Sequence, residues 1–418
     1  MRQASAEPQS SDAIASAHED SAARSATAFL GLAPFLRMNI AGADLRPIAQ
    51  DLLAKAQQDA ADANLWMNLS TAMLCLGQRD VGLAVQAQAL EMERVYRLAA
   101  SRQPASLRLL VLAAPGDLAA NTPLDCLLEE SDIDLDFHFV SPVAPLAQTV
   151  PEHDAIMVTA SECDENRDLL QALERVLADW PRPVINAPQN IPATARNTAS
   201  LLLRDAPGLI IPPTLRVARA QLQAIAAGSA RLAELLDGCD FPVILRPLDS
   251  HAGRDLARVT CPEDVAAYLS RVNGAEFFLS PFIDYSGKDG LFRKVRVALI
   301  DGAAYGCHMA VSSHWMVHYV NAGMYEDAAK RAEEARFMEH FDAFAQRHRL
   351  ALDAIHRRTG LDYVCIDCAE TRDGRLLIFE IDHAMVVHAM DPEELFPYKR
   401  VQMQKVQNAF RDFLLRRL

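Results

Sequence analysis

The sequence lacks long apolar runs, a surplus of basic charge and the glycine pattern of a dinucleotide-binding turn. No apolar run reaches the ~18 residues that a membrane-spanning helix needs, so we expect no membrane insertion. The 418 residues carry 41 Lys and Arg against 55 Asp and Glu, a net charge of −14. This charge argues against nucleic acid and anionic lipid surfaces as partners. The turn after the first predicted strand is Ala114-Pro115-Gly116-Asp117 rather than G-x-G-x-x-G, so the dinucleotide fingerprint is absent.

We also expect neither a secretory signal nor a disulfide framework. Residues 1–26 contain acids and no apolar core, so they do not form a signal peptide. Their Ala, Ser and Gln content is typical of a disordered tail. The eight cysteines are spread over the chain without a short-spaced framework. We therefore predict reduced thiols and a cytoplasmic protein.

The acidic charge is distributed unevenly. Residues 101–200 carry 15 acids and 6 bases, whereas residues 201–300 carry 11 acids and 12 bases. The near-neutral stretch is where we expect groups that bind a small anion to gather.

The length suggests two or three domains at ~150 residues each. Residues 27–103 are predicted to be helical, since Leu65, Leu69, Met73 and Leu76 follow a helical period. The stretch from Trp66 to Ala89 resembles one tetratricopeptide repeat, which cannot bury its apolar face alone. An ordinary helical hairpin explains the same pattern equally well.

The spacing of the apolar residues changes after Pro104 from a helical period to continuous apolar runs. Strands predicted at 107–114, 135–140, 155–159 and 182–186 alternate with helices at 118–130 and 165–178, which indicates an α/β domain with a parallel sheet over 104–200. Residues 201–418 predict an α+β domain of antiparallel strands, the first at 209–217. Its helices are expected at 219–236, 263–272, 331–358 and 400–416. Asp-Gly pairs such as Asp373-Gly374 predict hairpin turns.

Three carboxylates are predicted to converge near the end of the chain. Glu380 and Asp382 are two residues apart in a predicted strand and share a face. The hairpin turn at Asp373-Gly374 places Asp367 opposite them. Oxygen ligands without Cys or His favour Mg²⁺, which commonly bridges carboxylates to nucleotide phosphates. Solvated charges on a half-exposed hairpin are the alternative.

Basic residues are predicted on two other strands. Arg246 leads into a loop of small and polar residues, 249–255, in which backbone N–H groups can approach phosphates. Lys294 and Arg296 share one face of a strand, and two adjacent cations attract an anion such as phosphate. The alternative is a sheet face neutralised by salt bridges.

The order of these segments resembles the ATP-grasp superfamily of carboxylate–amine and carboxylate–thiol ligases, especially the ribosomal-protein glutamate ligase type. The stretches DYSGKDGLFRKVRVALIDG, SSHWMVHYVNAGM, GLDYVCIDCAE and FEIDHAMVVHAMDP resemble bacterial proteins that join a tetratricopeptide-like N-terminus to an ATP-grasp domain. The resemblance covers about residues 105–418. It implies a Rossmann-like domain before the ATP-grasp fold, with ATP and Mg²⁺ as cofactors.

The resemblance also implies roles for individual residues. Lys294 and Arg296 would face phosphates or an acyl-phosphate, and Asp367, Glu380 and Asp382 would hold Mg²⁺. The remaining nucleotide contacts would come from Arg246, from the loop residues Asp249, Ser250, His251, Gly253 and Arg254, and from the hinge residues Pro281, Phe282, Ile283 and Asp284. Arg246 stands where the family commonly has Lys, and Asp382 where it commonly has Asn.

Five histidines lie in the resembling segments: His308, His314, His318, His383 and His388. A base that deprotonates an incoming ammonium would assist the ligase reaction, and we assign this role to His318. The predicted acceptor site comprises His314, Trp315, His318, Tyr319, Asn321 and His383. Buried core histidines and a zinc pair on a helix at 314 and 318 are the alternatives.

The resemblance also brings the linker 183–200 close to the nucleotide or the substrate. This linker contains Asn186, Asn190, Arg196 and Asn197. Because Asn and Pro commonly set loop geometry, we favour a turn-rich linker here.

The resemblance therefore implies an ATP-grasp ligase that forms ADP and phosphate through an acyl-phosphate. The expected substrate is a peptide or protein carboxylate, such as that of a natural-product precursor peptide. A ligase for free amino acids or small metabolites is one alternative, and a non-catalytic peptide-binding scaffold is another. Assembly into a homo-oligomer is left open.

Overall fold

The computed structural model describes residues 27–143, 145–146, 150–248, 250 and 253–418. The predicted tail, residues 1–26, lies outside this range, as do the predicted loop residues Asp249 and His251. The chain divides into two compact units, whose described parts are residues 27–98 and 99–418. Within the described residues, no helix has the length and apolarity needed to cross a membrane.

The first unit is helical and ends in a short strand. It contains α2 (Ala33–Ile40), α3 (Arg46–Gln58), α4 (Ala63–Cys75), α5 (Arg79–Met92) and β1 (Val95–Leu98). Asp62 caps α4 by accepting hydrogen bonds from the backbone N–H groups of Asn64 and Leu65. Gly82 on α5 lies so close to Leu74 that a Cβ there would come within 2.7 Å of the Leu74 Cγ. The two helices therefore pack tightly as a hairpin; a tetratricopeptide repeat remains a prediction.

The second unit begins with the predicted parallel sheet. Its strands β2 (Leu107–Ala113), β3 (Ile133–Phe139), β4 (Ala155–Val158) and β5 (Val184–Ile185) run parallel in the order β3-β2-β4-β5. The apolar face of α7 (Arg167–Leu177) contributes to their core. The helix predicted over 118–130 is confined to α6 (Leu124–Leu127). One reason is Asn121, whose side chain binds both the N–H and the carbonyl of Ala114 and holds 115–122 as a loop.

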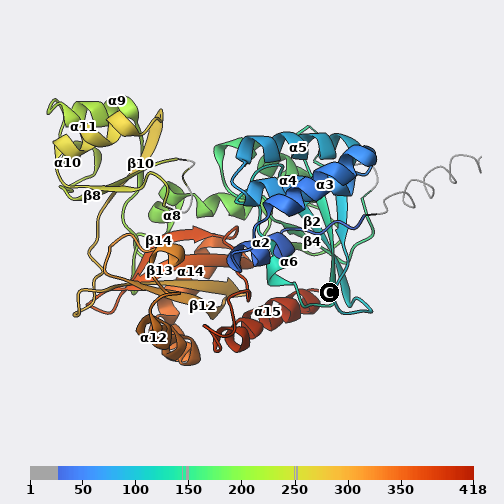
Figure 1. The fold of residues 1–418 in the computed structure, drawn as a ribbon. Coiled ribbons are helices and arrows are strands. Elements are labelled where there is room, and N and C mark those ends of the chain that lie inside the picture. Colours follow the sequence, from blue (N-terminus) through green and yellow to red (C-terminus); the bar gives the residue numbers. More distant parts are fainter. Residues whose placement is uncertain (1–26, 144, 147–149, 249, 251–252) are drawn as a thin grey trace, which may run out of the picture. The chain divides into compact units, whose positions relative to one another are not determined.

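A small antiparallel sheet follows in the chain. Its strands are β7 (Leu215–Ala218), β8 (Val243–Pro247), β9 (Ala257–Val259) and β10 (Glu276–Pro281), in the order β7-β10-β8-β9. Figure 1 shows α9 (Arg219–Ala226) and α11 (Pro262–Arg271) together above this sheet, near the short α10 (Leu232–Leu235), and side chains of all three helices share its core.

A second, larger sheet carries most of the predicted site. Its order is β12-β11-β13-β14-β6, with β11 (Phe292–Ile300), β12 (Ala303–Ser312), β13 (Tyr363–Glu370) and β14 (Leu376–Asp382) antiparallel. The edge strand β6 (Leu209–Ile210) is parallel to β14. The helices of this region are α12 (Ala328–Glu339), α13 (Phe341–Arg347), α14 (Arg349–Thr359) and α15 (Lys399–Arg416).

The strand predicted over 209–217 is split between the two sheets. Residues 209–210 belong to β6 in the large sheet and residues 215–218 to β7 in the small sheet. Pro212 and Pro213 lie between them, and proline has no N–H to donate to a strand partner. The predicted helix over 331–358 likewise consists of three helices, α12, α13 and α14.

The register of the large sheet brings polar residues into one row. Arg296 on β11 pairs with His308 on β12 and with Asp367 on β13. Asp367 in turn pairs with Glu380 on β14. Because directly paired residues point to the same face, these four side chains lie across one face of the sheet. The hairpin predicted from Asp373-Gly374 is therefore confirmed, and Asp367 lies opposite Glu380.

A buried ionic cluster lies at the start of α15. The Lys399 ammonium is 3.0 Å from Asp391 and 3.5 Å from Glu334. Tyr319 and Tyr398 donate hydrogen bonds to the Glu334 carboxylate at 2.8 and 2.7 Å. Lys399 is the only cation that ion-pairs with Glu334 or Asp391 among the described residues, so the cluster depends on it.

We predict that Lys399→Met lowers the free energy of unfolding by about 3–5 kcal/mol, because two buried carboxylates would lose their counter-charge. Urea unfolding of the full chain measures this loss. The exposed Lys405→Met on the same helix is the matched control and should change stability little. Equal stability of the two variants would contradict a structural role for Lys399.

Candidate active site

Asp367 is the buried centre of the candidate site. Its two carboxylate oxygens bind the Lys294 ammonium at 2.7 Å and the Arg296 guanidinium at 2.8 Å. A second Arg296 nitrogen lies 3.1 Å from the carboxylate, and another donates to the Val386 carbonyl at 2.9 Å. Lys294 and Arg296 therefore form the salt-bridged sheet face that was the alternative to a bound phosphate.

Asp367, Lys294 and Arg296 form the Asp367 triad. Burial and neighbouring charges set the pKa values of Asp367 and Arg296. The Asp367 side chain is 2% exposed, which alone would raise its pKa. Arg296 and Lys294 outweigh that effect and hold the pKa well below its usual range. Burial would lower the pKa of Arg296, and Asp367 instead raises it. Asp367 and Arg296 are therefore both charged at neutral pH.

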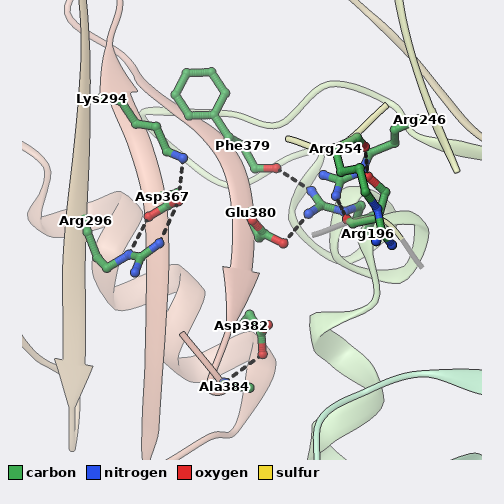
Figure 2. Close-up of polar contacts among 11 residues, drawn as sticks. Arg196, Arg246, Arg254, Lys294, Arg296, Asp367, Phe379, Glu380, Asp382 and Ala384 are labelled. Atoms are coloured by element: carbon green, nitrogen blue, oxygen red, sulfur yellow. Dashed lines mark hydrogen bonds and ion pairs between the residues drawn. The ribbon is translucent and has the colours of Figure 1, made fainter. Parts of the chain in front are cut away.

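Glu380 is paired with a cation from a different part of the chain. The Arg196 guanidinium, at the start of α8 (Arg196–Leu203), binds the Glu380 carboxylate and donates to the Phe379 carbonyl at 3.1 Å. Burial would raise the pKa of Glu380, and Arg196 and Arg246 outweigh it, so the pKa lies below its usual value. Figure 2 shows Arg196, Arg246 and Arg254 gathered on one side of Glu380, with the Asp367 triad on the other.

The cationic side of Glu380 includes a buried N–H donor that has no partner in the part of the chain that the structure describes. Arg246, on β8, donates to the Ser250 carbonyl, and Ser250 donates to the Arg254 carbonyl. The Nε–H of Arg246 is buried and has no acceptor among the described residues. Burial, followed by the charge of Arg196, lowers the pKa of Arg246 to about 10. This N–H is available to an anion.

The loop beyond Arg246 packs against the segment after β12. Gly253 adopts φ +74°, a conformation that side chains rarely adopt, and a Cβ there would lie 3.6 Å from the Met316 sulfur. Asp255 also has a positive φ of 55°. Gly253 and Asp255 thus both adopt left-handed backbone conformations.

The predicted hinge segment, 281–284, adjoins Trp315. Phe282 makes an edge contact with Trp315 at 5.7 Å, and the Arg258 guanidinium lies 4.2 Å above the Phe282 ring. Pro281 ends β10, opposite Val243, and Ile283 packs on the apolar cluster around Tyr285. The Asp284 carboxylate accepts the N–H of Ser286 at 2.9 Å, which lowers its pKa.

Residues 313–321 form turns and a short 3₁₀ helix rather than an α-helix. The helical spacing that would suit zinc at His314 and His318 is therefore absent. Burial and the charges of Lys294 and Arg296 lower the pKa of His318, which keeps its ring neutral near the triad. The Asn321 side chain accepts the N–H of His318 at 2.9 Å, while Tyr319 belongs to the Lys399 cluster.

His383 is fully buried at the end of β14. Its Nε2 lies 3.1 Å from the Ala160 carbonyl, and its Nδ1 has no hydrogen-bond partner among the described residues. Nδ1 is 3.8 Å from the Asp382 carboxylate, which accepts the N–H of Ala384 at 2.8 Å. Burial lowers the pKa of His383 to about 4, so the ring is neutral at pH 7.

The three predicted metal ligands contribute oxygen donors only. Within the described residues, no three or more His, Cys, Asp or Glu side chains are already arranged around a metal position. Asp367 and Glu380 are instead neutralised by cations. The chemistry of the set still fits Mg²⁺, because Glu380 and Asp382 come from one strand and Asp367 lies opposite Glu380.

Sequence reasoning treated Arg196 as part of a turn-rich linker, yet it is the cation that pairs with Glu380. No local pattern could reveal this, since the partners are 184 positions apart. Asn186 does serve loop geometry: it has a positive φ of 53° and exchanges two hydrogen bonds with the Tyr363 backbone. Asn190 similarly donates to the Gly360 carbonyl.

No protein-family model matches the chain. Solved structures that are similar include the VanG D-Ala:D-Ser ligase of Enterococcus faecalis, with 12% identity over 72% of this chain and 98% of the other, at a TM-score of 0.44. A RimK domain ATP-grasp protein of Sphaerobacter thermophilus has 19% identity over 74% of this chain and 99% of the other, at a TM-score of 0.38. The ATP-grasp ligase PsnB was solved with a precursor variant, Mg and ADP. It has 14% identity over 74% of this chain and 99% of the other, at a TM-score of 0.41. The last two are ATP-grasp proteins.

We predict that Asp367→Asn lowers the free energy of unfolding by about 3 kcal/mol or more, because Lys294 and Arg296 would face each other without their buried counter-charge. Urea unfolding measures the change. Asp353→Asn, which breaks a more exposed ion pair between Arg349 and Asp353 on α14, is the control and should have little effect. The added change Lys294→Met should restore part of the loss; no restoration would argue against charge repulsion as the cause.

Proposed function

We propose that the protein is an ATP- and Mg²⁺-dependent ligase that joins a carboxylate to a nucleophile through an acyl-phosphate. The observation that carries the proposal is the buried Arg246 Nε–H, which has no acceptor among the described residues and lies in a cation cluster facing Glu380. An anion that satisfies this donor would lie between Arg246 and the carboxylates of β13 and β14. A polyphosphate accompanied by a divalent cation matches both charges.

Each group has a proposed task in this reaction. Arg246, Ser250, Gly253 and Arg254 bind the phosphates of ATP, and the segment 281–284 binds the adenine and ribose. Asp367, Glu380 and Asp382 would hold Mg²⁺, which when bound neutralises phosphate charge and orients the transferring group. Lys294 and Arg296 are already fixed by Asp367 and stabilise charge on the transferred phosphoryl group without further rearrangement.

The proposed reaction has two steps. A substrate carboxylate oxygen attacks the γ-phosphorus and ADP leaves, giving an acyl-phosphate. The nucleophile then forms a bond to the acyl carbon, the carbon–oxygen bond to phosphate breaks, and phosphate departs with the electron pair. His318 is neutral because of its buried, cationic surroundings, so it is able to accept the proton that the nucleophile releases.

We further propose that the carboxylate belongs to a peptide or protein, such as a natural-product precursor. The support is the helical hairpin of the first unit, since helical repeats commonly bind peptides. Incubation with ATP and candidate peptides, followed by mass spectrometry, tests this choice. A conjugate or water-loss mass accompanied by ADP supports it, whereas ADP formation with free amino acids alone favours a small-metabolite ligase.

MgATP at about 100 times its Kd should stabilise the wild type by about 2.7 kcal/mol, seen as a raised melting temperature. We predict that Glu380→Gln removes most of the Mg²⁺-dependent part of this shift, because the metal would lose a carboxylate. The exposed Glu394→Gln is the matched control and should retain the shift. A wild type that shows no nucleotide-dependent shift would overturn the enzyme proposals and leave a binding scaffold.

We also predict that Arg246→Met weakens ATP binding about 10- to 100-fold with or without Mg²⁺, because a charge-assisted hydrogen bond contributes about 1.5–3 kcal/mol. Fluorescent-nucleotide titration measures the affinity. The control Arg271→Met changes an exposed arginine on α11 and should leave the affinity unaltered. Unchanged affinity in the Arg246 variant would show that the phosphates bind elsewhere.

A further inference from the structure

A cavity of about 670 Å³ lies at one edge of the parallel sheet, where its strands begin. Arg108 is the second residue of β2, and Asp154 and Arg182 lie just before β4 and β5. At the other end of β4, the Ala160 carbonyl contacts His383 of the candidate active site. Sites for small ligands commonly have volumes of about 300–1,000 Å³. The cavity is therefore large enough for a ligand of its own, on the opposite edge of the sheet from the candidate active site.

Two stacked rings line part of the cavity. The centroids of Trp180 and His153 are 5.8 Å apart, with 20° between the ring planes. The Trp180 Nε1–H donates to Nε2 of His153 at 3.1 Å. Nδ1 of His153 lies 2.7 Å from the Pro151 carbonyl, so Nδ1 carries the ring proton. Because the polar atoms of both rings are bonded within this pair and to the backbone, the rings offer a ligand only apolar surface.

The acidic side chains of the cavity are bonded to the backbone or solvated. Asp154 accepts the backbone N–H of Arg108 at 2.8 Å, and Asp134 accepts that of Ala100 at 2.9 Å. The Glu152 side chain is 95% exposed, and its carboxylate lies 3.6 Å from the Arg108 guanidinium. An ion pair this exposed contributes little. The carboxylates therefore do not closely neutralise the arginines of the cavity.

The two arginines of the cavity have unused donors. The Arg108 guanidinium makes one hydrogen bond to a described residue, the Glu152 carbonyl, at 3.4 Å, and its buried Nε–H has no acceptor there. Arg182 is exposed and makes no hydrogen bond or ion pair within the described part of the chain. A guanidinium presents its N–H donors in a planar fork that matches a carboxylate. The cavity thus combines donors for an anion with an apolar ring surface.

We propose that this cavity is a binding site for an aromatic carboxylate, whose ring packs on Trp180 and whose carboxylate binds Arg108 and Arg182. A free aromatic acid and the C-terminal aromatic residue of a peptide both present this chemistry. An aromatic ammonium would pack on the same rings but would bring its positive charge to two guanidinium groups. The site lies outside the residues assigned to the ligase reaction and does not depend on that proposal.

Ligand-observed NMR titration of the full chain with phenylacetate tests the site. We expect Arg108→Met and Arg182→Met each to weaken binding about 10-fold or more, because each removes a charge-assisted hydrogen bond. Arg175→Met changes an exposed arginine on α7 and should bind phenylacetate like the wild type. Since Arg182 is exposed and bonded to no described residue, a loss in its variant does not come from unfolding. Unchanged affinity in either cavity variant, or a wild type that does not bind phenylacetate at millimolar concentrations, overturns the proposal.

Matched probes check the chemical class of the ligand. Acetate lacks the ring, and phenethylammonium carries a positive charge in place of the carboxylate. Each should bind about 10-fold or more weakly than phenylacetate. Equal or tighter binding of either probe contradicts an aromatic carboxylate site. N-acetylphenylalanine separates the two sources: binding tighter than that of phenylacetate identifies a peptide C-terminus, and weaker binding identifies a free acid. None of these titrations requires ATP turnover, so their outcome is independent of the proposed ligase reaction.

Discussion

The ion pairs of Asp367 with Lys294 and Arg296 are the interaction on which the candidate site depends. They link β11 to β13 through charges that are nearly excluded from water. Removal of either partner would therefore lower the free energy of unfolding substantially. They also fix two cations in one orientation before any ligand arrives. A site that must stabilise phosphate charge gains from this arrangement, since no side chain has to reorganise.

The part of the site that could be predicted from the sequence is the part set by local rules. Side chains alternate along a strand, and an Asp-Gly turn limits the register of a hairpin, so Asp367 and Glu380 were expected on one face. Alternation also placed Lys294 and Arg296 together. The alternation of side chains did not predict which anion Lys294 and Arg296 bind, because the buried Asp367 and a bound phosphate are both consistent with it.

The unpredicted parts come from contacts between distant segments. Arg196 binds Glu380 from the start of α8, and His383 contacts Ala160 from 223 positions away. Local errors have local causes: Asn121 competes for the backbone of Ala114, and Pro212 and Pro213 interrupt a run that otherwise reads as one strand.

The separation of β6 from β7 has a consequence for the architecture of the second unit. Every strand of the small sheet lies between residues 215 and 281, so the chain enters that sheet once and leaves it once. Leu215 pairs with Leu279, which means that the entering and leaving strands are neighbours. The small sheet is therefore an insertion with adjacent ends, a module that could be excised and bridged by a short linker. Arg246, Ser250, Gly253 and Arg254 would be removed with it, whereas the Asp367 triad, Glu380 and Asp382 would be left in place.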